Sequence, residues 1–139
     1  MRAALDSSVI VAAIDGEDPD HAACRKLLLS AKFSIHAHAL SETFSTLTGG
    51  RLAIRVPATD AATMLRRWVA PRLAVVALAT RDLLRAFDES SARGVRGGAI
   101  YDYLHLVAAR KARASALYTL NVSDFQSFHR TGDPEIVHP

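Results

Sequence analysis

Residues 3–10 read Ala3-Ala4-Leu5-Asp6-Ser7-Ser8-Val9-Ile10, and this stretch decides the fold. Its first three residues form a short apolar run of strand character, and the next three turn the chain into an apolar helix that continues to about Ile14. Short polar side chains favour such a junction because they accept hydrogen bonds from the free N–H groups of the first helical turn. A strand that leads directly into a helix predicts an α/β unit.

The same alternation of strand and helix signals continues to the end of the chain. We expect strands at Ala3–Leu5, Phe33–His38, Leu73–Leu78, Ala116–Leu120 and Glu135–Val137, and helices at about 9–14, 20–30, 40–49, 59–70, 80–93, 100–113 and 123–128. This alternation predicts an α/β fold in three αβα layers, with a mostly parallel central sheet. No linker or internal repeat is present, so residues 1–139 are expected to form a single domain.

Length and composition restrict the class of protein. The chain has 139 residues, of which 50% are hydrophobic and 22% charged, as in a soluble globular domain. No apolar run approaches the roughly 20 residues that span a bilayer, and the first residues lack the features of a signal peptide. Cys24 is the only cysteine, which excludes an intrachain disulfide. We therefore expect a cytoplasmic protein without membrane contact.

The charge is unevenly distributed along the chain. The net charge is only +3, but residues 51–113 contain 12 Lys and Arg against 5 Asp and Glu. Positive side chains beside a group of carboxylates suit a phosphodiester substrate, because arginines bind phosphates while carboxylates bind a metal ion. A GC-rich genome also produces many arginines and alanines, so charge alone leaves nucleic-acid binding open.

Four acidic residues lie at strand ends or in first helical turns: Asp6, Glu42, Asp102 and Asp124. Parallel strands bring their carboxyl ends to one edge of a sheet, so carboxylates scattered along the chain converge there. Two like charges about 4 Å apart repel by roughly 4 kcal/mol at an effective dielectric constant near 20. A cluster of carboxylates therefore needs a cation or bound protons, and hard oxygen ligands suit Mg²⁺ or Mn²⁺.

Each acid also has a purely structural explanation. Asp6 is a suitable cap for the helix that follows it. Glu42 and Asp102 are acids near helix starts, which the helix dipole favours. Asp124 lies within Ser123–Gln126, which has the sequence of a capping box. Their shared position at strand-to-helix junctions favours a common site over four separate caps.

Together, these residues resemble the PIN-domain family. The matching segments are Leu5-Asp6-Ser7-Ser8-Val9, Ser41-Glu42, Tyr101-Asp102 and Thr119-Leu120-Asn121-Val122-Ser123-Asp124-Phe125. Their order and spacing, and the chain length, are most similar to the VapC-type toxins of bacterial toxin–antitoxin pairs. The resemblance covers nearly the whole chain. It implies a metal-dependent endoribonuclease that cleaves RNA, a cognate antitoxin protein as partner and a homodimer.

The resemblance also implies a role for each site residue. The four acids would surround Mg²⁺ or Mn²⁺ as catalytic and metal-binding residues, while Ser7 and Thr119 would hold the carboxylates and water by hydrogen bonds. Many members carry a further acid where this chain has Asn121. An asparagine adds no charge, so a second metal ion would bind weakly, and the number of metal ions stays open.

Further side chains are candidates for substrate contact. Arg96 lies in the loop before the helix of Asp102 and is a candidate phosphate ligand, with a solvated loop charge as the alternative. His105 lies one turn after Asp102 and reaches either the crevice or a phosphate, unless it is a buried structural histidine. Tyr101 and Trp68 are candidates for stacking on bases, unless they pack in the core or in an interface.

Two other readings remain open from the residues. His36 and His38 would share a face of a strand as half of a zinc site, although no third ligand is apparent. An aspartate-nucleophile phosphatase of the haloacid dehalogenase type also begins with a strand and an Asp, but it requires a second Asp at the position of Ser8. A catalytically silent PIN-fold module that binds RNA or protein is the main alternative to the nuclease.

Overall fold

A five-stranded parallel sheet forms the centre of the computed structural model, which describes residues 2–52 and 55–139. The strand order is β3-β2-β1-β4-β5, and each described pairing is parallel. The strands are β1 (Ala3–Leu5), β2 (Phe33–His36), β3 (Leu73–Val76), β4 (Ala116–Tyr118) and β5 (Glu135–Val137). The expected parallel sheet is confirmed, and β2, β3 and β4 each end two residues earlier than the sequence predicted.

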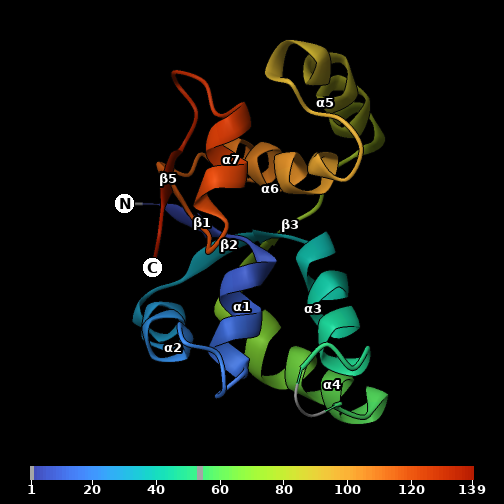
Figure 1. Ribbon diagram of the computed structural model, residues 1–139, viewed down its shortest axis with the longest axis vertical. Coiled ribbons are helices and arrows are strands. Elements are labelled where there is room, and N and C mark those ends of the chain that lie inside the picture. Colours follow the sequence, from blue (N-terminus) through green and yellow to red (C-terminus); the bar gives the residue numbers. More distant parts are fainter. Residues whose placement is uncertain (1, 53–54) are drawn as a thin grey trace.

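Helices cover both faces of this sheet, which confirms the predicted three layers (Figure 1). On one face lie α1 to α4, and on the other lie α6 and α7, with α5 packed on the outer side of α6. Their bounds are α1 (Ser7–Ile14), α2 (His21–Ser30), α3 (His38–Thr48), α4 (Ala58–Met64), α5 (Thr80–Arg93), α6 (Ala99–Lys111) and α7 (Val122–Phe128).

The single helix predicted for residues 59–70 is wrong in its second half. Regular α-helix ends at Met64, followed by a π-helical turn at Leu65–Val69 and a 3₁₀ turn at Ala70–Arg72. Pro71 lies in the 3₁₀ turn. A proline has no N–H and its ring collides with the carbonyl four residues earlier, so a regular helix cannot continue through it.

Two hydrophobic cores fill the layers on either side of the sheet. Successive side chains of a strand point to opposite faces, and β1 shows this directly: Leu5 packs with Ile10 of α1 on one side, while Ala4 packs with Leu106 of α6 on the other. All four residues are buried. The cores therefore hold α1 and α6 rigidly against the central strand.

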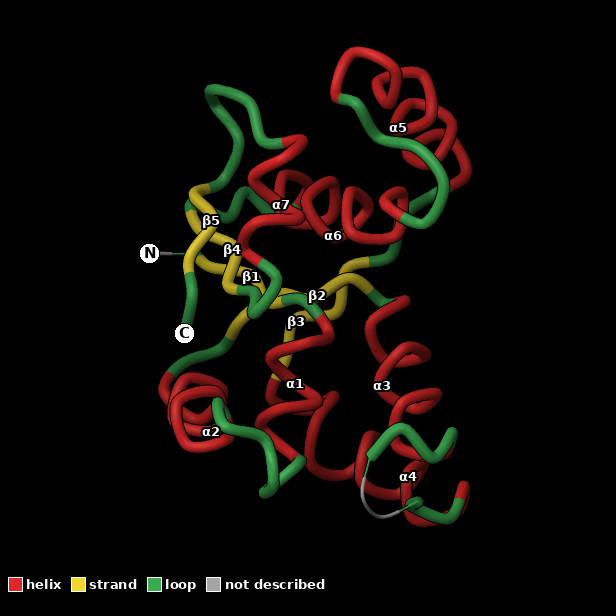
Figure 2. The backbone as a smooth tube through the Cα atoms, viewed as in Figure 1, coloured by secondary structure: helices red, strands yellow, loops and turns green. Residues whose placement is uncertain are grey.

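The carboxyl ends of the parallel strands meet at one edge of the sheet, where α1, α3 and α7 begin (Figure 2). Leu5, the last residue of β1, lies between Ile35 of β2 and Tyr118 of β4. The residues that follow these three positions are therefore brought together at the centre of the edge. Among residues 2–52 and 55–139, no helix is long and apolar enough to cross a membrane.

Candidate active site

Asp6 is held at the centre of this edge by Ser8 of α1 and by Thr119, which follows β4. It caps α1 and is only 2% exposed. Its Oδ1 accepts hydrogen bonds from the backbone N–H and the hydroxyl of Ser8, at 3.1 and 2.5 Å, and its Oδ2 accepts one from the Thr119 hydroxyl at 2.7 Å. The Ser8 and Thr119 hydroxyls in turn accept from the N–H groups of Leu120 and Asn121, both at 3.0 Å. These bonds fix the orientation of the Asp6 carboxylate.

The three residues expected to support the site differ in their placement. Thr119 contacts Asp6 as the resemblance implied, and Asn121 contributes through its backbone N–H. Ser8, not Ser7, is the serine bound to the carboxylate, and Ser7 lines a groove beside it. The helix start could have revealed Ser8, because the side chain of a capping residue bonds to the second or third N–H of its helix.

Asp102 and Asp124 lie in the first turns of α6 and α7. The capping box expected at Ser123–Gln126 is wrong, because α7 begins at Val122 with Asn121 as its cap. Asp124 is exposed to solvent, and Asp102 is half-buried. Both helices start at the same edge of the sheet as Asp6, so their first turns approach it from the side of the sheet opposite α1.

The pKa of Asp102 reflects the proximity of the other acids. Burial and the charge of Asp6 are the main causes that raise this pKa to about 6, and the charges of Asp124 and Glu42 add to them. The positive charge of His105 acts in the opposite direction. The pKa of Asp6 is also raised, because burial outweighs the charge of His105 and the hydrogen bonds that Asp6 accepts. The four predicted acids therefore interact at one site.

Glu42 and His105 form an ion pair across this site. Nε2 of His105, on α6, lies 2.8 Å from Oε1 of Glu42, on α3. Burial alone would lower the pKa of His105, but the bond to Glu42 and the charges of Asp6, Glu42 and Asp102 outweigh it and raise the pKa above its ordinary value. The pKa of Glu42 is lowered, since the bond and charge of His105 outweigh burial. His105 therefore places a positive charge among the acids when it is protonated, and it is not a free ligand for phosphate because its Nε2 is paired with Glu42.

The donor chemistry of the site fits a hard divalent cation, but direct ligation is not preformed. Mutually repelling carboxylates supply oxygen ligands of the kind that Mg²⁺ and Mn²⁺ bind. In the described part of the chain, however, no three His, Cys, Asp or Glu side chains are grouped so that they could hold a metal ion together. Both oxygens of Asp6 accept hydrogen bonds, and Glu42 is paired with His105. Mg²⁺ commonly keeps several waters, so this donor set suits a metal held partly through water.

A cluster of aromatic rings borders the acids. His36, which ends β2, is buried, and its ring lies edge-on to that of His105 with centroids 5.8 Å apart. Burial and the neighbouring charges of His105 and His38 lower the pKa of His36 to about 4. His38 opens α3 instead of extending the strand, and its ring stacks on Tyr101. His36 and His38 therefore do not share a strand face, and no described third ligand completes a zinc site.

A groove of about 470 Å³ runs along α3 and past the start of α1, and it contains one of the four acids, Glu42. It is lined by His38, Glu42, Arg51 and the hydroxyl residues Ser7, Ser41, Ser45 and Thr46. Arg51 places a positive charge in the groove that contains Glu42. Arg96, which the sequence suggested for this role, lines a different hollow with Ser90, Ser91, Gly94 and Val95. The structure therefore offers Arg51 as the nearer cation.

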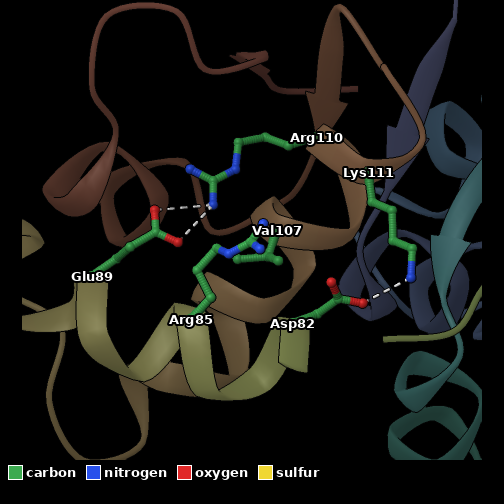
Figure 3. Close-up of a pocket in the computed structure, with 6 residues that line it drawn as sticks. All are labelled: Asp82, Arg85, Glu89, Val107, Arg110 and Lys111. Atoms are coloured by element: carbon green, nitrogen blue, oxygen red, sulfur yellow. Dashed lines mark hydrogen bonds and ion pairs between the residues drawn. The ribbon is translucent and has the colours of Figure 1, made fainter. Parts of the chain in front are cut away.

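Another hollow, between α5 and α6, contains the charged residues in Figure 3. Arg110 pairs with Glu89 at 3.3 Å, and Lys111 pairs with Asp82 at 2.8 Å. Lys111 is nine residues from Asp102 along α6, a distance of about 13 Å at 1.5 Å per residue. These pairs join α5 to α6 and lie outside the acidic site.

Comparison with known proteins relates the chain to one family. Residues 3–130 match the family model described as PIN domain. The chain is similar to Ribonuclease VapC27 of Mycobacterium tuberculosis, with 32% identity over 111 residues that cover 80% of this chain and 79% of the relative.

Solved structures share the fold at lower sequence identity. One is VapC20 of M. tuberculosis, a toxin that cleaves the sarcin–ricin loop, with a TM-score of 0.71, 20% identity and 99% of each chain covered. Another is a toxin–antitoxin complex from Klebsiella pneumoniae, with a TM-score of 0.68, 15% identity and coverage of 100% of this chain and 98% of the other.

Proposed function

The chain belongs to the PIN-domain family, and on this premise we propose that it is a metal-dependent endoribonuclease and the toxin of a toxin–antitoxin pair. The observation that carries the proposal is the buried Asp6, held by Ser8 and Thr119 at the carboxyl edge of the sheet, where its charge helps to raise the pKa of Asp102. The ribonuclease activity named for VapC27, at 32% identity, supports it.

In this proposal, Asp6 and Asp102 are the main ligands of Mg²⁺ or Mn²⁺, and Glu42 and Asp124 complete the shell directly or through water. The bound ion would polarise a phosphoryl oxygen and lower the pKa of a water molecule. Asn121 supplies no additional charge at this edge of the sheet, which favours one bound ion over two.

The protein's own residues divide the remaining work. Ser8 and Thr119 fix Asp6 in one orientation, so its carboxylate needs no reordering when substrate binds. Asp124 is exposed, and no described residue donates a hydrogen bond to its carboxylate, so it is free to accept the proton of the attacking water. Glu42 is less suited to this role, because His105 already occupies one of its oxygens.

Attack by water leaves the RNA 2′-hydroxyl unused, so the products should carry 5′-phosphate and 3′-hydroxyl ends. Comparison of the wild type with Asp6→Asn and Asp102→Ala tests the assignment by growth after induction, RNA end mapping and sensitivity to EDTA. We expect growth arrest and cleavage only for the wild type. Products ending in a 2′,3′-cyclic phosphate, or variants that cleave like the wild type, would contradict the proposal.

The antitoxin and a second copy of the chain are the proposed protein partners. The toxin–antitoxin complex from K. pneumoniae, which shares the fold, supports the first. Leu28 of α2 and Leu47 of α3 lie in the buried interior and are not available to a partner, although Leu29, next to Leu28, is half exposed. Leu84 and Phe87 of α5 are half exposed and offer apolar contact area instead. Light scattering of the isolated chain and of Phe87→Ser tests the homodimer.

One observation favours the catalytically silent module as a second candidate. The Glu42–His105 pair already neutralises a carboxylate, and no described trio of ligands is grouped for a metal. Under this alternative the wild type would bind RNA or protein but leave RNA intact with either Mg²⁺ or Mn²⁺. The phosphatase alternative is not retained, because the chain is a PIN-family member and Ser8 serves as a hydrogen-bond partner of Asp6.

A further inference from the structure

Tyr101 and His38 form a stacked pair of aromatic rings at the mouth of the acidic site. His38 is the first residue of α3, and Tyr101 lies in the first turn of α6. Their ring centroids are 5.8 Å apart and the ring planes differ by 17°. Tyr101 is 53% exposed, and His38 is also exposed. The pair thus joins two segments that are distant in sequence without burying either ring.

Burial in the hydrophobic interior does not explain why aromatic residues occupy these two positions. Aromatic residues stabilise proteins mainly by burying a large apolar area, and half of Tyr101 remains in water. Within the described residues, neither the Tyr101 hydroxyl nor the His38 ring nitrogens form a hydrogen bond. An exposed aromatic surface held between two helix starts is instead available to a flat ligand.

The pair lies directly beside the proposed catalytic groups. Tyr101 precedes Asp102, and His38 lines the groove that contains Glu42. We infer that the Tyr101–His38 pair is a stacking platform for one unpaired nucleobase of the RNA substrate, adjacent to the phosphate that is cleaved. This inference rests on the proposed ribonuclease function and names a residue-level contact for its substrate. Aromatic rings stack on any base, but bases in a duplex have both faces covered, so the platform requires a single-stranded segment.

The groove provides a path for the strand beyond the platform. Arg51 and the hydroxyls of Ser41 and Ser45 line it beside His38 and Glu42. Arginine and serine side chains are common partners of nucleic-acid phosphates, which they position without reading sequence. A base on the platform would therefore leave the neighbouring backbone between the acids and the Arg51 groove.

Trp68 provides a matched control, because it is an equally exposed aromatic residue at the other edge of the sheet. It is 63% exposed in the π-helical turn that leads into β3. The strands are parallel, so the start of β3 lies opposite the edge where β1, β2 and β4 end. Loss of Trp68 should leave binding at the acidic site unchanged.

Fluorescence of 2-aminopurine tests the platform. The probe is an oligouridylate of about 12 nucleotides in which 2-aminopurine replaces one uridine at each position in turn, bound to protein carrying Asp102→Asn so that hydrolysis does not interfere. We expect quenching at one position. In this background Tyr101→Leu should abolish the quenching and weaken binding about 5- to 150-fold, the range for loss of one base stack. Tyr101→Phe and Trp68→Leu should stay within about twofold, and circular dichroism verifies folding.

An abasic scan identifies the same contact independently. Removing the base at the quenched position should weaken binding by the Asp102→Asn protein but have no further effect once Tyr101→Leu is present. Equal quenching and affinity with and without Tyr101→Leu would overturn the platform, even where the wild type cleaves RNA. Stacking without cleavage of any RNA by the wild type would instead overturn the proposed nuclease and retain the contact.

Discussion

His105 and Glu42 are 63 residues apart in the sequence, yet Nε2 of His105 lies 2.8 Å from Oε1 of Glu42. The pair connects α6 to α3 across the carboxyl edge of the sheet and places a cation among four acids. It offsets part of the repulsion that the acids exert on one another.

Removal of His105 should destabilise the protein most between mildly acidic and neutral pH. His105→Leu deletes a hydrogen bond between charged groups, which contributes about 1.5–3 kcal/mol. The pKa of His105 is raised, so its contribution is complete below the ordinary value of 6.5 and is lost as pH rises through the higher folded value. The pKa of Glu42 is lowered, so its contribution is complete above 4.5 and is lost as pH falls through the lower folded value.

Urea unfolding between pH 4 and 9 measures this effect. Glu42→Gln is the control, since its amide oxygen can still accept from His105 but carries no charge. A difference between wild type and His105→Leu that is constant over the whole range would mean that the pair is not ionic.

Asp102→Asn should stabilise the metal-free protein while abolishing RNA cleavage. The pKa of Asp102 is raised from 3.8 to about 6, so the ionised carboxylate destabilises the folded state at neutral pH. A shift of this size corresponds to about 1–3 kcal/mol after allowance for solvent screening. The penalty is absent below pH 4 and develops as pH rises to about 6.

Thermal unfolding in EDTA checks this prediction, with the exposed Asp88→Asn on α5 as the matched control. We expect a higher midpoint for Asp102→Asn at pH 7, and a gain that shrinks toward pH 4. An unchanged midpoint at pH 7 would show that neither burial nor the neighbouring acids destabilise the ionised Asp102 carboxylate.

Thr119→Val should lower both stability and activity. The substitution keeps the shape of the side chain but removes the hydroxyl that donates to Asp6 and accepts from the Asn121 N–H. Asp6 is buried whereas Asn121 is exposed, so most of the loss, about 1–3 kcal/mol, should come from the bond to Asp6. Thr119→Ser retains the hydroxyl and is the control. Equal unfolding midpoints and cleavage rates for the two variants would argue against a role of this hydroxyl.

Divalent metal should stabilise the wild type and not Asp102→Asn. Ligand that binds only the folded state stabilises it by RT ln(1 + [L]/Kd), about 2.7 kcal/mol when its concentration is 100 times Kd. Differential scanning fluorimetry with Mg²⁺ or Mn²⁺ measures the shift, and Asp60→Asn, an exposed acid on α4, should behave like the wild type. A shift that Asp102→Asn retains would place the metal elsewhere.

Local sequence signals were sufficient for most of the fold. Apolar runs predicted each strand. Gly94 marks the end of α5, where its φ of 70° is a left-handed conformation that glycine adopts easily. The helix predicted for residues 59–70 was too long. Its apolar spacing continues toward Pro71, but the backbone changes from α-helix to a π-helical turn after Met64.

Asp6, Asp102 and Asp124 were identified from their position after a strand or at a helix start, since parallel strands align those ends. Glu42 was expected in a first turn as well, but α3 begins at His38, so Glu42 lies one turn inside the helix.

The sequence by itself determined the layers, the parallel sheet and the acids at its edge, because hydrophobic period and helix-start chemistry act over a few residues. Tertiary structure alone decided that His105 would neutralise Glu42 and that His38 would stack on Tyr101. The His105–Glu42 and His38–Tyr101 contacts both join α6 to α3, so they depend on the distance between the first turns of these two helices. That distance is set by the packing of both cores, to which residues along the whole chain contribute.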